Sequence, residues 1–302
     1  MGWGAVDDSE SIRAIHAAIE HGVNLFDTAD LYGCGHSEQL LGQAMQGRRQ
    51  ELVIASKFGY RIDEARKEVV GCIDLPAEIG AALRASLRRL RTDYVDLYQL
   101  HIQNCPEDRA VDVQAALEDL VTAGTIRAYG WSTDDPERVA MFKASEHFVA
   151  MQHAFNVLQG SEAMLAAVER NGLTSLCRGP LAMGLLTDKW RERGAVPPDD
   201  LRSSWNHAAG AVPLMLQLVA EIREILMQDG RSLPQGALGW LWARSDAVIP
   251  IPGFRNEAQA IENATAIEMG PLRQDQMDAI EKTVSRTFPD NPWDLRDSSA
   301  GA

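Results

Sequence analysis

Short apolar runs alternate with segments of helical periodicity along almost the whole chain of 302 residues. The apolar runs are 23–26, LVIAS from 52, VDLYQL from 95, IRAYGW from 126, VAMQ from 149, LTSLC from 173 and AVIPI from 247. Helical periodicity is found near 9–21, 36–46, 77–91, 110–123, 135–144, 161–171, 213–229, 234–244, 256–268 and 273–286. Strands that each precede a helix favour parallel pairing with right-handed crossovers. The predicted fold class is therefore α/β, a (β/α)8 or TIM barrel.

The alternation predicts a single barrel domain over residues 1–286 and a C-terminal tail over 287–302. The tail has no apolar period. Residues 187–212 interrupt the alternation, because they are rich in proline, glycine and charge and are too long for an ordinary connection. We expect this segment to form a lid over one rim of the barrel.

Composition excludes several classes of function. The formal net charge of −14 disfavours a nucleic acid or an anionic membrane surface as partner. No apolar run reaches the roughly 18–20 residues that a membrane helix needs, and the N-terminus does not resemble a signal peptide. The four cysteines have neither metal-binding nor disulfide-framework spacing. These features predict a reduced, cytoplasmic protein without a metal.

Four polar residues lie at the ends of the first three long apolar runs. VNLFDTADLYG supplies Asp27 and Tyr32, LVIASK supplies Lys57, and VDLYQLH supplies His101. Parallel strands in a barrel end at one rim, so we expect these side chains to meet there. A phenol beside an ammonium can give its proton to a carbonyl oxygen, and an imidazole can orient that carbonyl. The set therefore indicates reduction of a carbonyl by an external hydride donor.

Each of these residues has a simpler explanation when taken alone. Asp27 could begin a turn, Lys57 could extend to solvent and His101 could be a rim histidine. Two other enzyme classes fit the sequence less well. A metal-dependent hydrolase would need clustered ligands such as an HxH pair, which the chain lacks. A Schiff-base aldolase could use Lys57, but an aspartate paired with it would keep the amine charged.

The ordered motifs resemble the aldo-keto reductase superfamily from about residue 6 to about residue 286. The likeness rests on DTADLYG, on the strands ending in Lys57 and His101, on HSEQLLG, GPLAMGLLTDK and IPIPGFRNEAQAIEN. The resemblance implies an NADP-dependent oxidoreductase that transfers hydride to a small aldehyde or ketone. It implies Tyr32 as general acid, His101 as the group that orients the carbonyl, and Lys57 with Asp27 as groups that tune the acid.

A nicotinamide cofactor would bind without the doubly wound fingerprint, because no GxGxxG follows a strand. The resemblance places the carboxamide near Ser132, Thr133 and Gln152. It assigns the remaining cofactor contacts to Arg178, Pro180, Leu181, Gly184, Leu186, Lys189, Gly253, Arg255, Gln259, Glu262 and Asn263. An arginine at a helix N-terminus suits a 2′-phosphate, so NADPH is expected rather than NADH. Thr133 replaces the usual asparagine, and Arg178 replaces a ring-stacking aromatic residue.

The N-terminal region departs most from the family. Only 22 residues precede the strand that ends in Asp27, whereas relatives begin with a hairpin and a first barrel strand. We expect the first strand to be missing from this chain, with a late start of the sequence favoured over a smaller barrel. Contacts within a homo-oligomer could fill the gap. Trp3, Cys34 and Trp293 are expected in the substrate pocket. The alternative function is a reductase-like regulatory subunit that binds cofactor without turnover.

Overall fold

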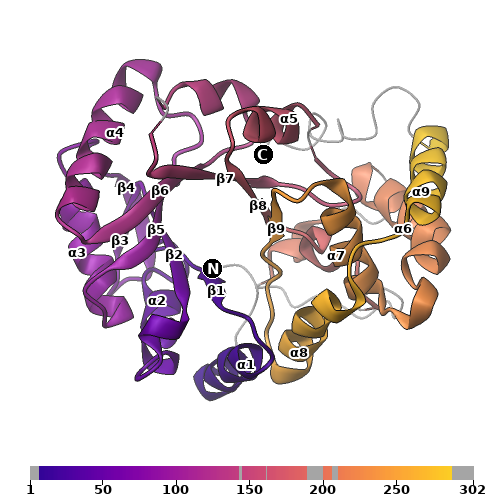
Figure 1. Cartoon of the computed structure of the whole chain (residues 1–302). Helices are drawn as coiled ribbons and strands as arrows, with labels where there is room; N and C mark the ends of the chain where they lie inside the picture. The colour runs from indigo at the N-terminus through magenta and orange to yellow at the C-terminus, as the bar shows by residue number, and fades with distance from the viewer. Residues whose placement is uncertain (1–6, 143–144, 161, 189–199, 206–209, 288–302) are drawn as a thin grey trace.

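A computed structural model of the chain describes residues 7–142, 145–160, 162–188, 200–205 and 210–287. Seven parallel strands form one curled sheet in the order β1-β2-β5-β6-β7-β8-β9 (Figure 1). They are β1 (Leu25–Asp27), β2 (Val53–Phe58), β5 (Val95–Leu100), β6 (Ile126–Ser132), β7 (Phe148–Ala154), β8 (Thr174–Arg178) and β9 (Val248–Pro250). Each one coincides with a predicted apolar run. Consecutive strands pair side by side, as expected for a (β/α)8 arrangement.

Helices lie around the outside of the sheet (Figure 1). They are α1 (Asp8–Glu20), α2 (His36–Ala44), α3 (Ile79–Leu90), α4 (Glu107–Thr122), α5 (Glu162–Arg170), α6 (Ala211–Leu226), α7 (Leu233–Arg244), α8 (Glu257–Thr265) and α9 (Gln274–Thr287). The predicted helix at 135–144 is instead a 3₁₀ turn, η2 (Pro136–Ala140). Val139 and Phe142 both pack into the core, and their spacing of three residues suits the tighter turn.

One hairpin was not predicted. It consists of β3 (Tyr60–Asp63) and β4 (Glu68–Cys72), which pair antiparallel directly after β2. Every residue of β4 is exposed, including Val69 and Val70. The segment therefore lacks the alternation of buried and exposed positions that identifies a strand from sequence.

The sheet is open between its two edge strands. Within the described ranges, β1 pairs only with β2, and β9 pairs only with β8. This agrees with the predicted barrel that lacks its first strand. Helices α1 and α8 pack together beside the opening (Figure 1), and an ion pair of 2.9 Å joins Arg13 to Glu257 there. A cavity of about 910 Å³ extends from β1 to β9.

Alternation along the strands places two layers of side chains inside the sheet. The lower layer is apolar and includes Leu25, Ala55, Leu97, Ala150 and Leu176. Two residues further along the same strands come Asp27, Lys57, Gln99, Gln152 and Arg178. Since successive side chains on a strand point to opposite faces, residues two apart share the interior. The layer of polar side chains is therefore adjacent to the layer of apolar side chains inside the sheet.

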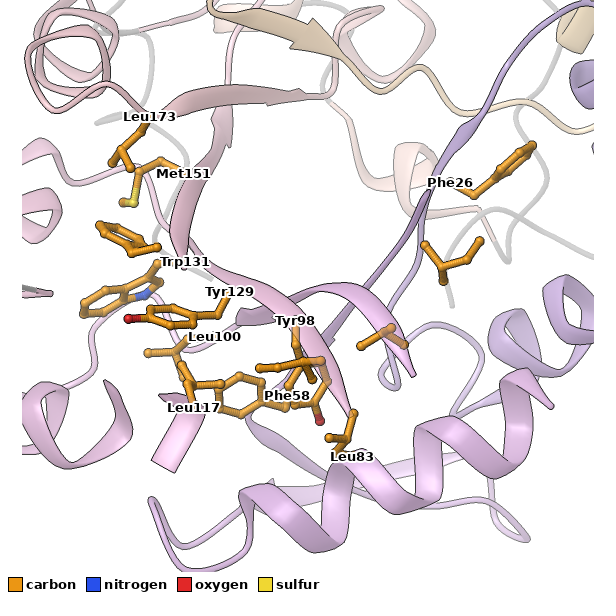
Figure 2. Packing of buried hydrophobic residues seen from close by; sticks show 14 of the residues in the cluster. Phe26, Phe58, Leu83, Tyr98, Leu100, Leu117, Tyr129, Trp131, Met151 and Leu173 are labelled. Atoms are coloured by element: carbon orange, nitrogen blue, oxygen red, sulfur yellow. The ribbon is translucent and has the colours of Figure 1, made fainter. Parts of the chain in front are cut away.

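The opposite face of the sheet packs against the helices. Figure 2 shows Phe58, Tyr98, Leu100, Tyr129 and Trp131 among side chains of α3 and α4. The rings of Phe58 and Tyr98 stack at 4.7 Å between centroids. Burial of this apolar area, at about 25 cal/mol per Å², is the main stabilising contribution to such a scaffold.

We predict that a glycine at a helix contact is required for stability. An ideal Cβ on Gly236 in α7 would lie 2.0 Å from the carbonyl oxygen of Leu226 at the end of α6. Gly236→Ala should therefore lower the free energy of unfolding by about 1–3 kcal/mol or more in urea titrations. The control is Gly80→Ala in α3, where the nearest atom is Nη1 of Arg84 at 3.4 Å. The control should be neutral or gain up to about 1 kcal/mol, and equal effects of the two changes would contradict the close contact.

Candidate active site

An ion pair lies inside the curled sheet at the ends of β1 and β2. The ammonium of Lys57 donates to Oδ1 of Asp27 at 2.5 Å and to the carbonyl oxygen of Thr28 at 2.8 Å. The Lys57 side chain has 0 % exposure and that of Asp27 has 8 %. A buried ammonium is tolerated only where it is paired and hydrogen-bonded. The sequence places both groups here because Asp27 is the last residue of β1 and Lys57 is the last but one of β2, its parallel neighbour.

Tyr32 and His101 lie around this ion pair. The Lys57 nitrogen is 4.9 Å from the centroid of the Tyr32 ring. The rings of Tyr32 and His101 meet edge to face, with centroids 6.0 Å apart. Tyr32 is 38 % exposed, so its ring is accessible from solvent. The structure thus brings together all four side chains that were predicted to be catalytic.

Two further side chains contact the aspartate. Oδ2 of Asp27 accepts from Nε2 of Gln152 at 2.8 Å and from Nε2 of Gln99 at 3.1 Å. Gln152 was predicted as a contact of the nicotinamide, whereas Gln99 was not predicted at all. It could have been found from VDLYQLH, because Gln99 is two residues before His101 and shares its face of the strand.

The pKa values of Lys57 and His101 shift in opposite directions. Burial alone would lower the pKa of Lys57, but the Asp27 carboxylate and then the Tyr32 phenol outweigh it and raise the pKa. Burial, followed by the charges of Lys57 and Arg178, lowers the pKa of His101 to about 3. Lys57 is therefore charged and His101 neutral near pH 7.

A buried ion pair supports the loop that carries Tyr32. Glu38 in α2 accepts from Nε of Arg89 at 2.6 Å and from Oγ of Ser56 at 2.5 Å, and all three side chains are buried. Gly35 has a φ of +88°, and a Cβ there would lie 2.6 Å from Cδ of Arg89. The glycine and the glutamate of the sequence GHSE are thus explained by contact with α3.

Asp30 lies in the same loop, two residues before Tyr32. Its side chain is buried, and Oδ1 has no hydrogen-bond partner among the described residues. Burial, followed by the charge of Glu38, raises the pKa of Asp30 to about 7. The carboxyl is consequently largely protonated in mildly acidic solution.

The predicted carboxamide contacts lie at the ends of β6 and β7. Ser132 pairs with Gln152 in the sheet register, and the N–H of Thr133 donates to the carbonyl oxygen of Gln152 at 2.9 Å. Arg178 ends β8 and forms an ion pair with Asp134, which also accepts from the N–H of Ala154. These residues adjoin the catalytic set through Gln152.

The loop after β8 holds the next predicted contacts. Pro180 and Leu186 are buried, while Leu181 and Gly184 are partly buried around the 3₁₀ turn η3 (Ala182–Gly184). Leu186 has 0 % exposure and packs in the core formed with α6 and α7. Lys189 lies outside the described residues.

The second group of predicted cofactor contacts surrounds the start of α8. Asn256 caps this helix, and the Arg255 N–H donates to Oε1 of Gln259 at 2.9 Å. Nδ2 of Asn263 donates to the carbonyl oxygen of Gly253 at 3.4 Å, and Glu262 is partly buried. Asp27, Tyr32, Gly253 and Asn263 line the cavity of about 910 Å³. Two of the four predicted catalytic residues and two residues of the α8 group thus line the same cavity.

Of the predicted substrate-pocket residues, one is buried and two lie outside the residues that the structure describes. Cys34 is 1 % exposed and is not among the residues that line this cavity. Trp3 and Trp293 lie outside the described residues. Tyr60 of the hairpin, which was not predicted, meets the His101 ring edge to face at 5.7 Å between centroids.

Comparison with known proteins decides the family. The profile of the Aldo/keto reductase family matches residues 1–285. The chain belongs to the aldo/keto reductase family. It is 30 % identical over 299 residues to the aldo-keto reductase YhdN of Bacillus subtilis, covering 95 % of this chain and 87 % of that protein. It is 29 % identical over 281 residues to the aldo-keto reductase yakc [NADP(+)] of Schizosaccharomyces pombe, covering 89 % and 82 %.

A solved relative confirms the architecture of this aldo/keto reductase. The glycerol dehydrogenase AKR11B4 of Gluconobacter oxydans superposes with a TM-score of 0.81 at 30 % identity, covering 96 % of this chain and 89 % of that one. Within the described parts of the reductase, no three His, Cys, Asp or Glu side chains are placed to hold a metal ion. No helix in those parts is both long and apolar enough to span a membrane.

Asp30 should make the stability of this reductase fall as the pH rises. The native carboxyl keeps its proton up to about pH 7, whereas the unfolded one loses it near 3.8. Between these values only the native state holds the proton, so the free energy of unfolding decreases by up to about 1.4 kcal/mol per pH unit. Asp30→Asn removes this contribution. Urea titrations at pH 5 and pH 8 measure the free energy of unfolding. Between these pH values that free energy should fall by roughly 2 kcal/mol or more in the wild type beyond any change in the variant.

The matched control is Asp119→Asn, which changes an exposed carboxyl on α4. It should follow the wild type at both pH values. A wild type and an Asp30→Asn variant that change in parallel would show that Asp30 ionises alike in both states.

Proposed function

We propose that this reductase transfers hydride from NADPH to the carbonyl carbon of an aldehyde or ketone, with Tyr32 as the general acid. The observation that carries the proposal is the buried Lys57–Asp27 pair beneath the accessible ring of Tyr32, with the neutral His101 at the edge of that ring. In the reverse direction the same groups would support alcohol oxidation.

The proton for the developing alkoxide comes from the phenol of Tyr32. An ammonium close to a phenol favours the tyrosinate that remains after proton transfer. Lys57 has this role because Asp27 keeps it charged in a site with no exposure to water. A low-dielectric surrounding strengthens the effect relative to a surface pair.

His101 orients the carbonyl oxygen. Its Nδ1 is buried without a partner among the described residues. An unpaired N–H there would cost more free energy than a bare lone pair, so the proton is favoured on Nε2. An Nε2–H can donate to the substrate oxygen that receives the proton of Tyr32.

A cavity beside Asp27 and Tyr32 supports the assignment of a nicotinamide dinucleotide to the contacts around α8. The cavity reaches from Asp27 and Tyr32 to Gly253 and Asn263, and a Cβ on Gly253 would meet no heavy atom within 4 Å. When bound, NADPH supplies the hydride from its nicotinamide ring. We assign the carboxamide to Ser132, Thr133 and Gln152. The remaining contacts are Arg178, Pro180, Leu181, Gly184, Leu186, Lys189, Gly253, Arg255, Gln259, Glu262 and Asn263.

The preference for NADPH rests on Arg255 and on the N-terminus of α8. A guanidinium beside backbone N–H groups at a helix start suits a phosphate. The relative from Schizosaccharomyces pombe, whose name includes NADP(+), supports the assignment. Small carbonyl compounds are the substrates, with Trp3 and Trp293 proposed to contribute to their pocket.

Tyr32→Phe should abolish reduction while leaving cofactor binding intact. The variant loses only the hydroxyl, so we expect the loss of absorbance at 340 nm with a panel of aldehydes to slow by about 100-fold or more. Quenching of protein fluorescence by NADPH should stay within about twofold, since Tyr32 contributes chemistry rather than affinity. Turnover equal to that of the wild type would refute the assigned acid. Tight NADPH binding by a wild type without turnover would instead support the regulatory alternative.

Arg255→Ala should weaken NADPH more than NADH. Loss of a charge-assisted contact to phosphate costs about 1.5–3 kcal/mol, which is roughly a tenfold to hundredfold rise in KM for NADPH. KM for NADH should change little. Arg13→Ala, which removes an exposed guanidinium paired with Glu257 of α8, serves as the control and should leave both constants unchanged. An equal rise in KM for NADPH and for NADH would show that Arg255 does not bind the 2′-phosphate.

A further inference from the structure

Asp27 lies at a weakly supported position of the backbone. β1 is only three residues long, and among the described residues it pairs with β2 alone. A strand with one neighbour fixes its residues less firmly than one within a sheet. The position of the Asp27 carboxylate therefore depends on side chains from other strands.

Gln99 supplies one of these contacts from a strand that is paired on both sides. It is on β5, has 0 % exposure and donates from Nε2 to Oδ2 of Asp27 at 3.1 Å. Its Oε1 faces Nε2 of Gln152 at 3.4 Å. A flipped amide would turn an oxygen toward the carboxylate and a donor toward a donor, so the two contacts allow a single orientation.

The neighbouring strand leaves room for this side chain. Gly130 on β6 pairs with Gln99 in the register. A Cβ on Gly130 would lie 2.6 Å from the carbonyl oxygen of Ala150 and 3.4 Å from Cγ of Gln99. The absence of a side chain at Gly130 thus lets β6 and β7 approach while Gln99 extends toward Asp27.

We propose that Gln99 is a positioning residue for Tyr32, acting through Asp27 and Lys57. The inference rests on the proposed function. Gln152 also donates to Oδ2 of Asp27, but it is assigned to the carboxamide of the nicotinamide. Of the two amides that donate to Asp27, Gln99 is then the one that is not also assigned to the cofactor. It disperses the carboxylate charge and, by holding Oδ2, keeps Oδ1 turned toward Lys57.

The hydrogen bond from Gln99 to Asp27 affects how readily the Tyr32 phenol gives up its proton. Without the Gln99 donor, the Asp27 carboxylate exerts a more negative potential on Lys57 and on the phenol, which disfavours tyrosinate. The titratable groups around the network are Asp27 and Asp30 near β1, Lys57 on β2, Tyr60 on β3, His101 after β5 and Arg178 on β8. Lys57 remains the only cation in direct contact with Asp27 among the described residues.

The decisive experiment is a titration of tyrosinate absorbance at 295 nm, which needs no turnover. The signal of Tyr32 is obtained by subtracting the same protein carrying Tyr32→Phe. Gln99→Met keeps the length of the side chain and removes the amide. We expect its Tyr32 midpoint to move to higher pH by about half a unit to one unit. Its kcat for reduction should fall about fivefold to tenfold at an unchanged NADPH Kd.

Gln276→Met in α9 is the matched control. Gln276 is also buried and donates to a carboxylate, Asp229, at 3.3 Å, yet it is remote from the site. It should lose comparable stability without moving the Tyr32 midpoint. A Gln99→Met midpoint equal to that of the wild type and of Gln276→Met would overturn the inference. Because the titration is independent of turnover, it stays decisive even if the proposed reduction fails.

Gln99→Glu gives a second test should Gln99→Met not fold. A protonated glutamic acid can still donate to Asp27, whereas a glutamate repels it. Its kcat relative to the wild type should therefore be near normal at low pH and fall tenfold or more as the pH rises. A ratio that does not depend on pH would contradict a role through Asp27.

Discussion

The buried contact between Lys57 and Asp27 is the interaction on which the rest of this site depends. It holds a positive charge in the interior of a curled sheet, where burial alone would neutralise it. That charge lies beneath the Tyr32 ring and contributes to keeping His101 neutral. One ion pair thus places a buried positive charge beside both Tyr32 and His101, the two groups proposed to contact the substrate.

The scaffold explains why this pair can exist. An apolar layer from Leu25, Ala55 and Leu97 excludes water from below, while glutamine amides replace the water that would otherwise solvate Asp27. Around the rim, the Glu38–Arg89 pair holds the loop that presents Tyr32. Lys57, Asp27, Glu38 and Arg89 are thus each buried with a partner of opposite charge, which fits the high cost of an unpaired buried charge. The opening between β1 and β9 places Asp27 at an edge of the sheet, where such side-chain support matters most.

The sequence predicted the parts of the fold that have a strong local pattern. Seven apolar runs became strands, and Asp27, Lys57 and His101 met because parallel strands end at one rim. The β3–β4 hairpin could not be predicted, since β4 buries neither face, and η2 has a helical composition but tertiary contacts that favour a tighter turn. The spacing of Gln99 from His101 could have placed its side chain on the same face of the strand, but its contact with Asp27 on another strand is visible only in the fold.

The most direct test of the account is a single-turnover reaction with NADPH that carries deuterium at the reactive carbon of the nicotinamide. The protein, in excess over the cofactor, is mixed with an aldehyde, and the product is analysed by mass spectrometry. The account predicts an alcohol with deuterium at the former carbonyl carbon, formed at a rate that falls sharply in the Lys57→Met variant. Cofactor that is bound but keeps its deuterium, or a rate that does not change without the ammonium, would contradict it.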